Sequence, residues 1–153
     1  MSQPNPNQMP LEQQVQTVYQ QLQVIEQQIK LYQEQLEAFS QLYTELSLTI
    51  STLDGLKDAE DNQEVLIPVG SGAYVWATIK DKNKVLTLVG ARLHVEKSID
   101  DAKKTVYERR ARVEEMIKNI GSEIQRLSAD RERLIQFLEQ VNAKLMQDKN
   151  KNS

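Results

Sequence analysis

Residue types that carry chemistry are present in this chain, but their spacing does not assemble a catalytic or metal-binding set. His94 is the one histidine, it lies in a segment of alternating hydrophobicity without a second ligand, and there is no cysteine. Glu114 and Glu115 are adjacent, as are Asp100 and Asp101. Neighbouring residues on a helix diverge into solvent and do not form an acid and base pair. We therefore expect no enzymatic activity, no metal site and no cofactor.

The glycine-rich segment at residues 70–72, with the sequence GSG, resembles a phosphate-binding loop only superficially. A phosphate loop is followed by a helix and supplies a paired lysine, and this segment has neither. Glycine tolerates a positive φ, and the flanking residues alternate as strands do. The pattern predicts a hairpin turn.

Composition and charge exclude several classes of partner. The 153 residues include 22 acidic and 19 basic side chains, giving a net charge of -3, whereas nucleic-acid-binding surfaces are normally basic. No run of about 18 apolar residues is long enough to span a membrane, and residues 1–10 lack the basic and apolar regions of a signal peptide. We expect a cytoplasmic protein that binds neither nucleic acid nor membranes.

Residues 11–56 carry an uninterrupted helical pattern. Their apolar positions are spaced alternately by four and three residues, which is the signature of a left-handed coiled coil. A free helix of this length needs a partner along its apolar stripe. The stripe consists of Leu11, Val15, Val18, Leu22, Ile25, Ile29, Tyr32, Leu36, Phe39, Tyr43, Leu46, Ile50 and Leu53.

Residues 96–146 resume the same spacing, with one stutter near Val113. Predicted stripe residues include Ile99, Ala102, Val106, Arg109, Val113, Ile117, Ile120, Ile124, Leu127, Arg131, Leu134, Leu138, Val141 and Leu145. The remaining segments, residues 1–10 and 147–153, are polar and are predicted to be disordered tails.

The two predicted helices are the simplest partners for each other, folded back antiparallel. The first is rich in glutamate and the second in arginine and lysine, which favours their pairing. If Leu56 lies near Lys97, the numbers of facing residues sum to about 153. In that register Arg109 lies beside Tyr43 and Glu45, and Gly121 faces Tyr32.

Residues 57–95 differ from both helices because their side chains alternate with a period of two. The pattern predicts strands at residues 65–67, 73–80, 85–89 and 91–95, and therefore two consecutive hairpins. Two isolated hairpins bury little and leave open edges, so we expect them to pair with hairpins of other chains and close a barrel. The residues predicted to mediate assembly are Val65, Ile67, Tyr74, Trp76, Ile79, Leu86, Leu88 and Leu93.

The segments VLIPVGSGAYVWATI (residues 65–79) and KVLTLVGARLHVEKSIDDA (residues 84–102), set between two long helices, resemble those of archaeal prefoldin alpha subunits. The resemblance covers the chain from about Leu11 to Leu145. It implies an α+β fold in which a long antiparallel two-helix coiled coil is joined by two β-hairpins that assemble with other subunits into a β-barrel body. It also implies a hexamer of two alpha and four beta subunits that holds non-native proteins without nucleotide and passes them to a group II chaperonin.

A holdase of this kind needs reachable apolar side chains, and the free ends of the two helices are where we expect them. Several of these residues belong to the helical stripe, and for them an alternative reading is that they only hold the coil closed. The candidate client-binding residues are Leu11, Val15, Tyr19, Leu22, Leu134, Ile135, Phe137, Leu138, Leu145 and Met146.

A second class of function is also compatible with these patterns. The chain would then be a coiled-coil scaffold that oligomerises through its hairpins and binds no unfolded protein. Apolar residues in excess at the helix ends favour the chaperone, because a scaffold has no need of them.

Overall fold

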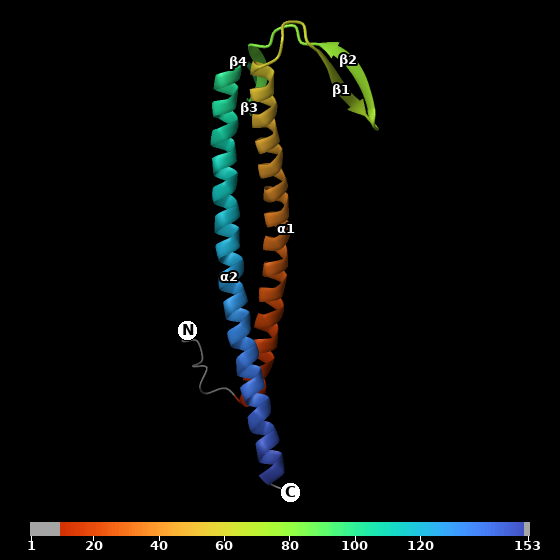
Figure 1. Ribbon diagram of the computed structural model, residues 1–153. Helices are drawn as coiled ribbons and strands as arrows, with labels where there is room; N and C mark the ends of the chain where they lie inside the picture. Colours follow the sequence, from red (N-terminus) through yellow and green to blue (C-terminus); the bar gives the residue numbers. More distant parts are fainter. Residues whose placement is uncertain (1–9, 152–153) are drawn as a thin grey trace. The chain divides into compact units, whose positions relative to one another are not determined.

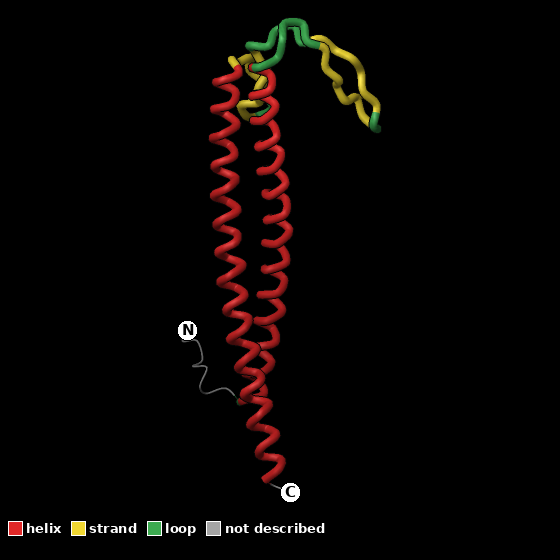
Figure 2. Tube along the Cα trace, in the orientation of Figure 1, coloured by secondary structure: helices red, strands yellow, loops and turns green. Residues whose placement is uncertain are grey.

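The computed structural model describes residues 10–151 of the chain. The tail predicted at residues 1–10 lies outside the described residues except for Pro10. The elements, traced in Figures 1 and 2, are α1 (Leu11–Lys57), β1 (Glu64–Gly70), β2 (Ala73–Thr78), β3 (Lys84–Gly90), β4 (Leu93–Ser98) and α2 (Ile99–Lys151). Two long helices joined by two antiparallel hairpins confirm the predicted fold class.

The described chain forms two compact units, and each is considered by itself. The terminal unit contains residues 10–38 and 117–151, and the central unit contains Phe39–Met116. In each unit a segment of α1 lies beside a segment of α2, and the central unit also carries both hairpins (Figure 1).

The start of α1 follows from Pro10, whose carbonyl accepts hydrogen bonds from the backbone N–H groups of Gln13 (2.9 Å) and Gln14 (3.1 Å). Glu12 in the first turn and Lys57 in the last carry the charges that the helix dipole favours at those ends. The helix therefore begins and ends within one residue of its predicted bounds.

The start of α2 differs from the prediction, because β4 continues to Ser98 and the helix begins at Ile99 rather than at residue 96. Ser98 caps the helix, since its Oγ accepts a hydrogen bond from the N–H of Asp101 at 3.2 Å. Helix α2 continues to Lys151, so the described part of the tail predicted at residues 147–153 is helical.

Apart from Ala59, the buried side chains in both units come from the predicted stripes. In the terminal unit they are Val18, Ile29, Ile120, Leu127 and Val141. In the central unit the buried stripe residues are Leu46, Ile50, Leu53, Ile99, Ala102, Val106 and Val113. Because the stripes are narrow, no large side chain of the described residues is fully shielded from solvent, and the most buried residue is the small Ala102 at 1% exposed.

Polar contacts fix the register of the helices in the central unit. Lys103 pairs with Asp54, and Lys57 with Asp100. In both pairs the residue numbers sum to 157 rather than to the predicted 153, a shift of about one helical turn. The shift is not the same for every contact, because Arg110 lies over Tyr43 and their residue numbers sum to the predicted 153.

Arg110 contacts α1. Its guanidinium lies over the rings of Tyr43 (5.5 Å) and Tyr107 (5.0 Å), and Nη1 donates to Ser47 Oγ at 3.3 Å. Arg109 is exposed, so its predicted place in the stripe is wrong. The two adjacent arginines differ in environment because one residue along a helix turns the side chain by about 100°.

The predicted packing of Gly121 against Tyr32 in the terminal unit is also wrong. A Cβ added at Gly121 would meet no atom within 4 Å. Tyr32 instead lies within electrostatic reach of Arg126.

Each hairpin is an isolated two-stranded antiparallel sheet. β1 pairs with β2 and β3 with β4, each with a bulge just before the turn, between Pro68 and Gly70 and between Leu88 and Gly90. Both turns have two residues with positive φ, Ser71 and Gly72 in the first and Ala91 and Arg92 in the second. Such turns match the right-handed twist of paired strands.

Candidate functional site

Among the described residues no group of three or more histidine, aspartate or glutamate side chains is placed to hold a metal ion. His94 is exposed on β4 opposite Leu88, and Asp100 is paired with Lys57. Of residues 70–72, Gly70 ends β1 and Ser71 and Gly72 form the turn of the first hairpin. No helix of the described chain has the length and hydrophobicity needed to cross a membrane.

Apolar side chains exposed on the hairpins form the most extensive candidate surface of the central unit. Trp76 is 72% exposed and Tyr74 60% exposed. They lie on one face of the first hairpin, where Trp76 is opposite Leu66 and Tyr74 is opposite Pro68. A tryptophan held in solvent by its own strand indicates a surface that another molecule covers.

The other predicted assembly residues divide between exposed and half-buried positions. Ile67, Leu86, Leu88 and Leu93 are exposed, whereas Val65 and Ile79 are half-buried. Ile79 N–H donates to the Gln63 carbonyl at 3.0 Å and closes the base of the hairpin. The prediction omitted further exposed apolar residues that the period-two pattern would have identified: Leu66, Val69, Val75, Val89 and Val95.

The two hairpins are repeats of one unit with an offset of 20 residues. β3 and β4 each begin 20 residues after β1 and β2, and all six strand pairs of one hairpin recur in the other at that offset. The bond from Ile79 N–H to Gln63 likewise recurs from Ile99 N–H to the Asn83 carbonyl at 3.3 Å. Sequence identity at the offset, as in Val69 and Val89 or Gly70 and Gly90, was the signal that sequence reasoning missed.

The second hairpin lies against the helices of its own unit. Hollows of about 400 and 390 Å³ separate β3 from the helices. Both hollows have apolar floors that include Leu42 and residues of α2, with Arg109 at the rim. Lys97 Nζ crosses from β4 to α2 and donates to Thr105 Oγ1 at 2.9 Å. The bond ties the base of the second hairpin to the first turns of α2.

In the terminal unit, Leu11 and Phe137 line one hollow of about 210 Å³. Leu134 lines a larger groove of about 550 Å³ with Val24 and Ile25 of α1. Val24 does not fit the spacing of the α1 stripe. Only the fold shows that it lines the same groove as the candidate residue Leu134. The structure thus brings together two pairs of apolar side chains from opposite helices.

The remaining candidate client-binding residues separate by exposure. Leu11, Tyr19, Leu145 and Met146 are exposed, with Met146 at 72%. The others are half-buried along the helix pair: Val15, Leu22, Leu134, Ile135, Phe137 and Leu138. Burial of stripe residues agrees with a role in holding the helices together, whereas the exposed four are free to meet another molecule.

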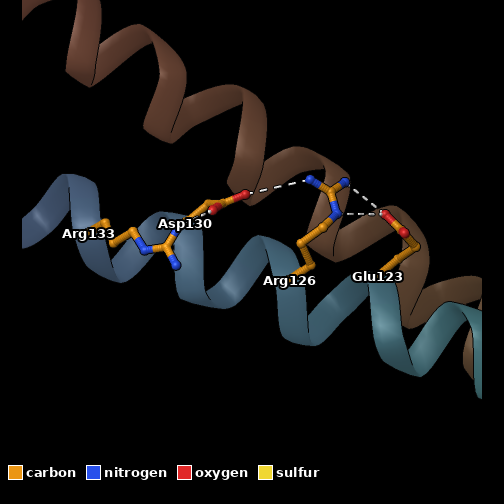
Figure 3. Close-up of polar contacts among 4 residues, drawn as sticks. All are labelled: Glu123, Arg126, Asp130 and Arg133. Carbon is orange, nitrogen blue, oxygen red and sulfur yellow. Dashed lines mark hydrogen bonds and ion pairs between the residues drawn. The ribbon is translucent and has the colours of Figure 1, made fainter.

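A chain of charged side chains follows α2 (Figure 3). Two of them, Asp130 and Arg133, line the larger groove. Arg126 donates to Glu123 at 2.8 Å and lies 3.5 Å from Asp130, which Arg133 contacts at 3.3 Å. The hydrogen bonds that Arg126 donates to the Glu123 carboxylate raise the pKa of Arg126. Contacts of this spacing stabilise an exposed helix by about 0.2–0.5 kcal/mol per pair. They strengthen α2 itself and place Asp130 and Arg133 at the groove.

Comparison with known proteins finds prefoldin subunits. The family model described as Prefoldin subunit matches residues 25–144. Prefoldin subunit alpha of Thermofilum pendens is 31% identical over 88 residues, 58% of this chain and 68% of that protein. Prefoldin subunit alpha of Methanopyrus kandleri is 37% identical over 71 residues, 46% of this chain and 45% of that protein.

Among solved structures, a chain in the cryo-EM structure of filamentous PFD from Methanocaldococcus jannaschii superposes with a TM-score of 0.68. The two chains are 24% identical, and the superposition covers 76% of this chain and 96% of the other. This likeness shows the fold of two helices and two hairpins.

Proposed function

The chain belongs to the prefoldin family, as a chaperone-type subunit similar to the archaeal alpha subunits, and on that premise we propose that it captures unfolded polypeptides without ATP. Capture takes place at the helix ends of the terminal unit. The proposal rests chiefly on the exposed apolar side chains there: Leu11, Tyr19, Leu145 and Met146.

Physical chemistry explains how such a surface holds a client. Each apolar contact contributes about 25 cal/mol per Å² buried, so a few side chains bind weakly and reversibly. Methionine and tyrosine adapt to varied apolar partners, which suits clients without a defined shape. Several subunits in one complex raise the avidity by offering contacts to the same chain.

We further propose that the hairpins assemble the chain with beta-type prefoldin subunits, as a hexamer of two alpha and four beta chains. The complex acts in the cytoplasm, needs no cofactor, and transfers its clients to a group II chaperonin. Apolar residues exposed on both hairpins support the assembly, because open sheet edges and uncovered Trp76 require a partner.

The test of client capture is an aggregation assay with a chemically denatured protein and the assembled complex. The variant Tyr19→Ser/Leu145→Ser/Met146→Ser changes exposed residues and leaves the buried stripe intact, and we expect it to suppress aggregation several-fold less well. Removing residues 11–22 and 134–146 should abolish suppression. Leu48→Ser, an exposed leucine of the central unit, is the matched control.

Native mass spectrometry of each variant separates loss of binding from loss of assembly. Undiminished suppression by the triple variant and by the truncated chain, with the complex intact, would reject capture at the helix ends. Transfer is tested separately, as the yield of refolded client after a group II chaperonin is added with ATP.

A second candidate function is that of a structural scaffold that polymerises through its hairpins. The observation in its favour is that the superposed Methanocaldococcus jannaschii chain comes from filamentous PFD. Electron microscopy of the chain alone distinguishes the two functions when combined with the aggregation assay. Filaments that leave aggregation unchanged would favour the scaffold.

A further inference from the structure

Arg131 is a charged residue in the apolar stripe of α2, within the terminal unit. It follows the buried Leu127 by four residues, precedes Leu134 by three, and is half-buried. Its Nε is the one side-chain nitrogen or oxygen in the described part of the chain that is shielded from solvent without a hydrogen-bond partner. Buried donors are nearly always paired, so this exception calls for an explanation.

The carboxylate next to Arg131 in the sequence is already engaged. Arg126 lies 3.5 Å from Asp130, and Arg133 contacts the same carboxylate at 3.3 Å (Figure 3). A guanidinium keeps its charge in a protein, so Arg131 does not relieve its burial by losing a proton. The remaining way to accommodate the charge is for water to reach the terminal nitrogens of this long side chain.

Packing of the helix pair is loose around Arg131. None of residues 19–28 and 128–140 is buried, and we call these two ranges the loose segment. The groove of about 550 Å³ opens here, and its lining includes the apolar side chains of Ile25 and Leu134. The unpartnered Nε and the poorly packed stretch of the stripe therefore coincide.

Buried stripe residues flank the loose segment on both sides. Val18 and Val141 lie nearer the start of α1 and the end of α2, and Ile29 and Leu127 lie further from those ends. The loosening is therefore internal to the helix pair and differs from the fraying expected of helix ends. An unpaired charge explains it, because closing the stripe over the guanidinium would remove water without supplying a counter-charge.

We propose that Arg131 is a positioning residue that keeps the loose segment able to open, so that its half-buried apolar side chains become available to a client. The free energy of such an opening is low because few buried contacts are lost. The inference rests on the proposed capture of unfolded polypeptides, and it adds which residue controls the release of apolar surface. The side chains released are Leu22, Ile25, Leu134, Ile135 and Leu138.

Arg131→Leu tests the proposal, because leucine lets the stripe close as it does at Leu127. Hydrogen-exchange mass spectrometry of the full chain should show backbone amides of the loose segment exchanging about tenfold more slowly or less. Residues 39–56 provide the internal reference. Arg133→Leu, an exposed change two residues away, is the matched control and should stay within about twofold of the unmodified chain. Unchanged exchange in Arg131→Leu would overturn the proposal.

Client capture supplies a readout whose direction a merely structural role does not predict. Arg131→Leu adds an apolar side chain, so a surface that needed only hydrophobicity would capture clients equally well or better. We expect the assembled complex to suppress aggregation several-fold less well, because the loose segment is held closed. Arg131→Lys keeps a charge in the stripe and should restore exchange and suppression to within about twofold. Suppression by Arg131→Leu that equals or exceeds that of the unmodified complex would contradict the proposal.

Two levels of failure are distinguishable in the same assay. If the unmodified complex does not suppress aggregation, the proposed capture fails and the role of Arg131 in it fails as well. If the unmodified complex suppresses aggregation but Arg131→Leu changes neither exchange nor suppression, capture stands and the role of Arg131 alone is rejected.

Discussion

Arg109 and Arg110 are chemically identical neighbours with different environments. The planar guanidinium of Arg110 lies over the rings of Tyr43 of α1 and Tyr107 of α2 and bonds to Ser47 of α1, while Arg109 is exposed. A guanidinium stacks and hydrogen-bonds at once, which an ammonium does not. The polar side chain therefore helps to set the register of the helix pair in the central unit.

This environment predicts a coupling between Arg110 and Tyr43. A double-mutant cycle with Arg110→Ala and Tyr43→Leu, measured by urea unfolding, should give a coupling free energy of about 0.5–1 kcal/mol. Arg110→Lys should recover only part of it. Arg109→Ala is the control and should change stability by less than about 0.5 kcal/mol. A coupling of zero would show that the stacking contributes nothing.

Gly121 offers a second test at the level of one residue. It lies inside α2, and a Cβ there would meet no atom within 4 Å. Gly121→Ala should therefore raise the free energy of unfolding by about 1 kcal/mol, the difference in helix propensity. Gly55→Ala, two residues from the end of α1, should gain less because helix ends fray. Destabilisation by Gly121→Ala would mean that the position is closely packed in the assembled protein.

At the level of elements, the junction between β4 and α2 shows how a short segment passes from strand to helix. Ser98 ends the strand and caps the helix, and Asp100 in the first turn pairs with Lys57 of α1. The hydrogen bond from Lys57 lowers the pKa of the Asp100 carboxyl, and the lysine charge acts in the same direction. One carboxylate thus connects the start of α2 to the end of α1.

The lowered pKa predicts how acid affects this junction. Because the native carboxyl binds its proton less readily than the unfolded one, its contribution is present above the unfolded pKa of about 3.9 and is lost as the pH falls through the native value. Asp100→Asn should remove that contribution at neutral pH and flatten the dependence of stability on pH below about 4. Urea unfolding between pH 2 and 7 measures it.

Added salt is the control, since the pair is exposed and screening should reduce the difference between Asp100→Asn and the unmodified chain. Parallel pH profiles for the two proteins at low salt would show that the ion pair does not contribute to stability.

For the whole molecule, the exposed hairpins mean that the chain is completed by other subunits. Both sheets have only two strands, and their apolar residues remain in solvent. An isolated hairpin is at best marginally stable in water, so its partner supplies much of the stabilisation. Assembly and stability are therefore linked, and each should depend on protein concentration.

Trp76→Ser tests this link. Burial of a large apolar side chain contributes about 1.5–3 kcal/mol, so the dissociation constant of the complex should rise about 10- to 100-fold. Client binding by the complex that remains should change little, because Trp76 lies in the central unit. Analytical ultracentrifugation over a range of concentrations measures the first effect. An unchanged dissociation constant would place Trp76 outside the interface.

The sequence by itself determined the two helices, the hairpins and the stripe residues, because periods of 3.5 and 2 are local properties of the chain. Every buried stripe residue, from Val18 to Val141, was predicted from spacing. The predicted bounds of α1 were close to the observed ones, because Pro10 and the residues after Lys57 interrupt the helix locally. Exposed apolar residues in the helix ends and hairpins were found in the same way.

Only the tertiary structure decided which residues meet. Strand β4 extends to Ser98 because that residue pairs with Lys84 of β3, a contact between segments that no local pattern contains. The two ion pairs between the helices lie four residues from the predicted register, and Arg110 bonds to Ser47 of α1. Likewise, the hairpins have equal strands and registers, but only three-dimensional packing shows that β3–β4 lies on its helices. Contacts between segments that are distant in the sequence depend on the path of the whole backbone between them, which the spacing of apolar residues does not specify.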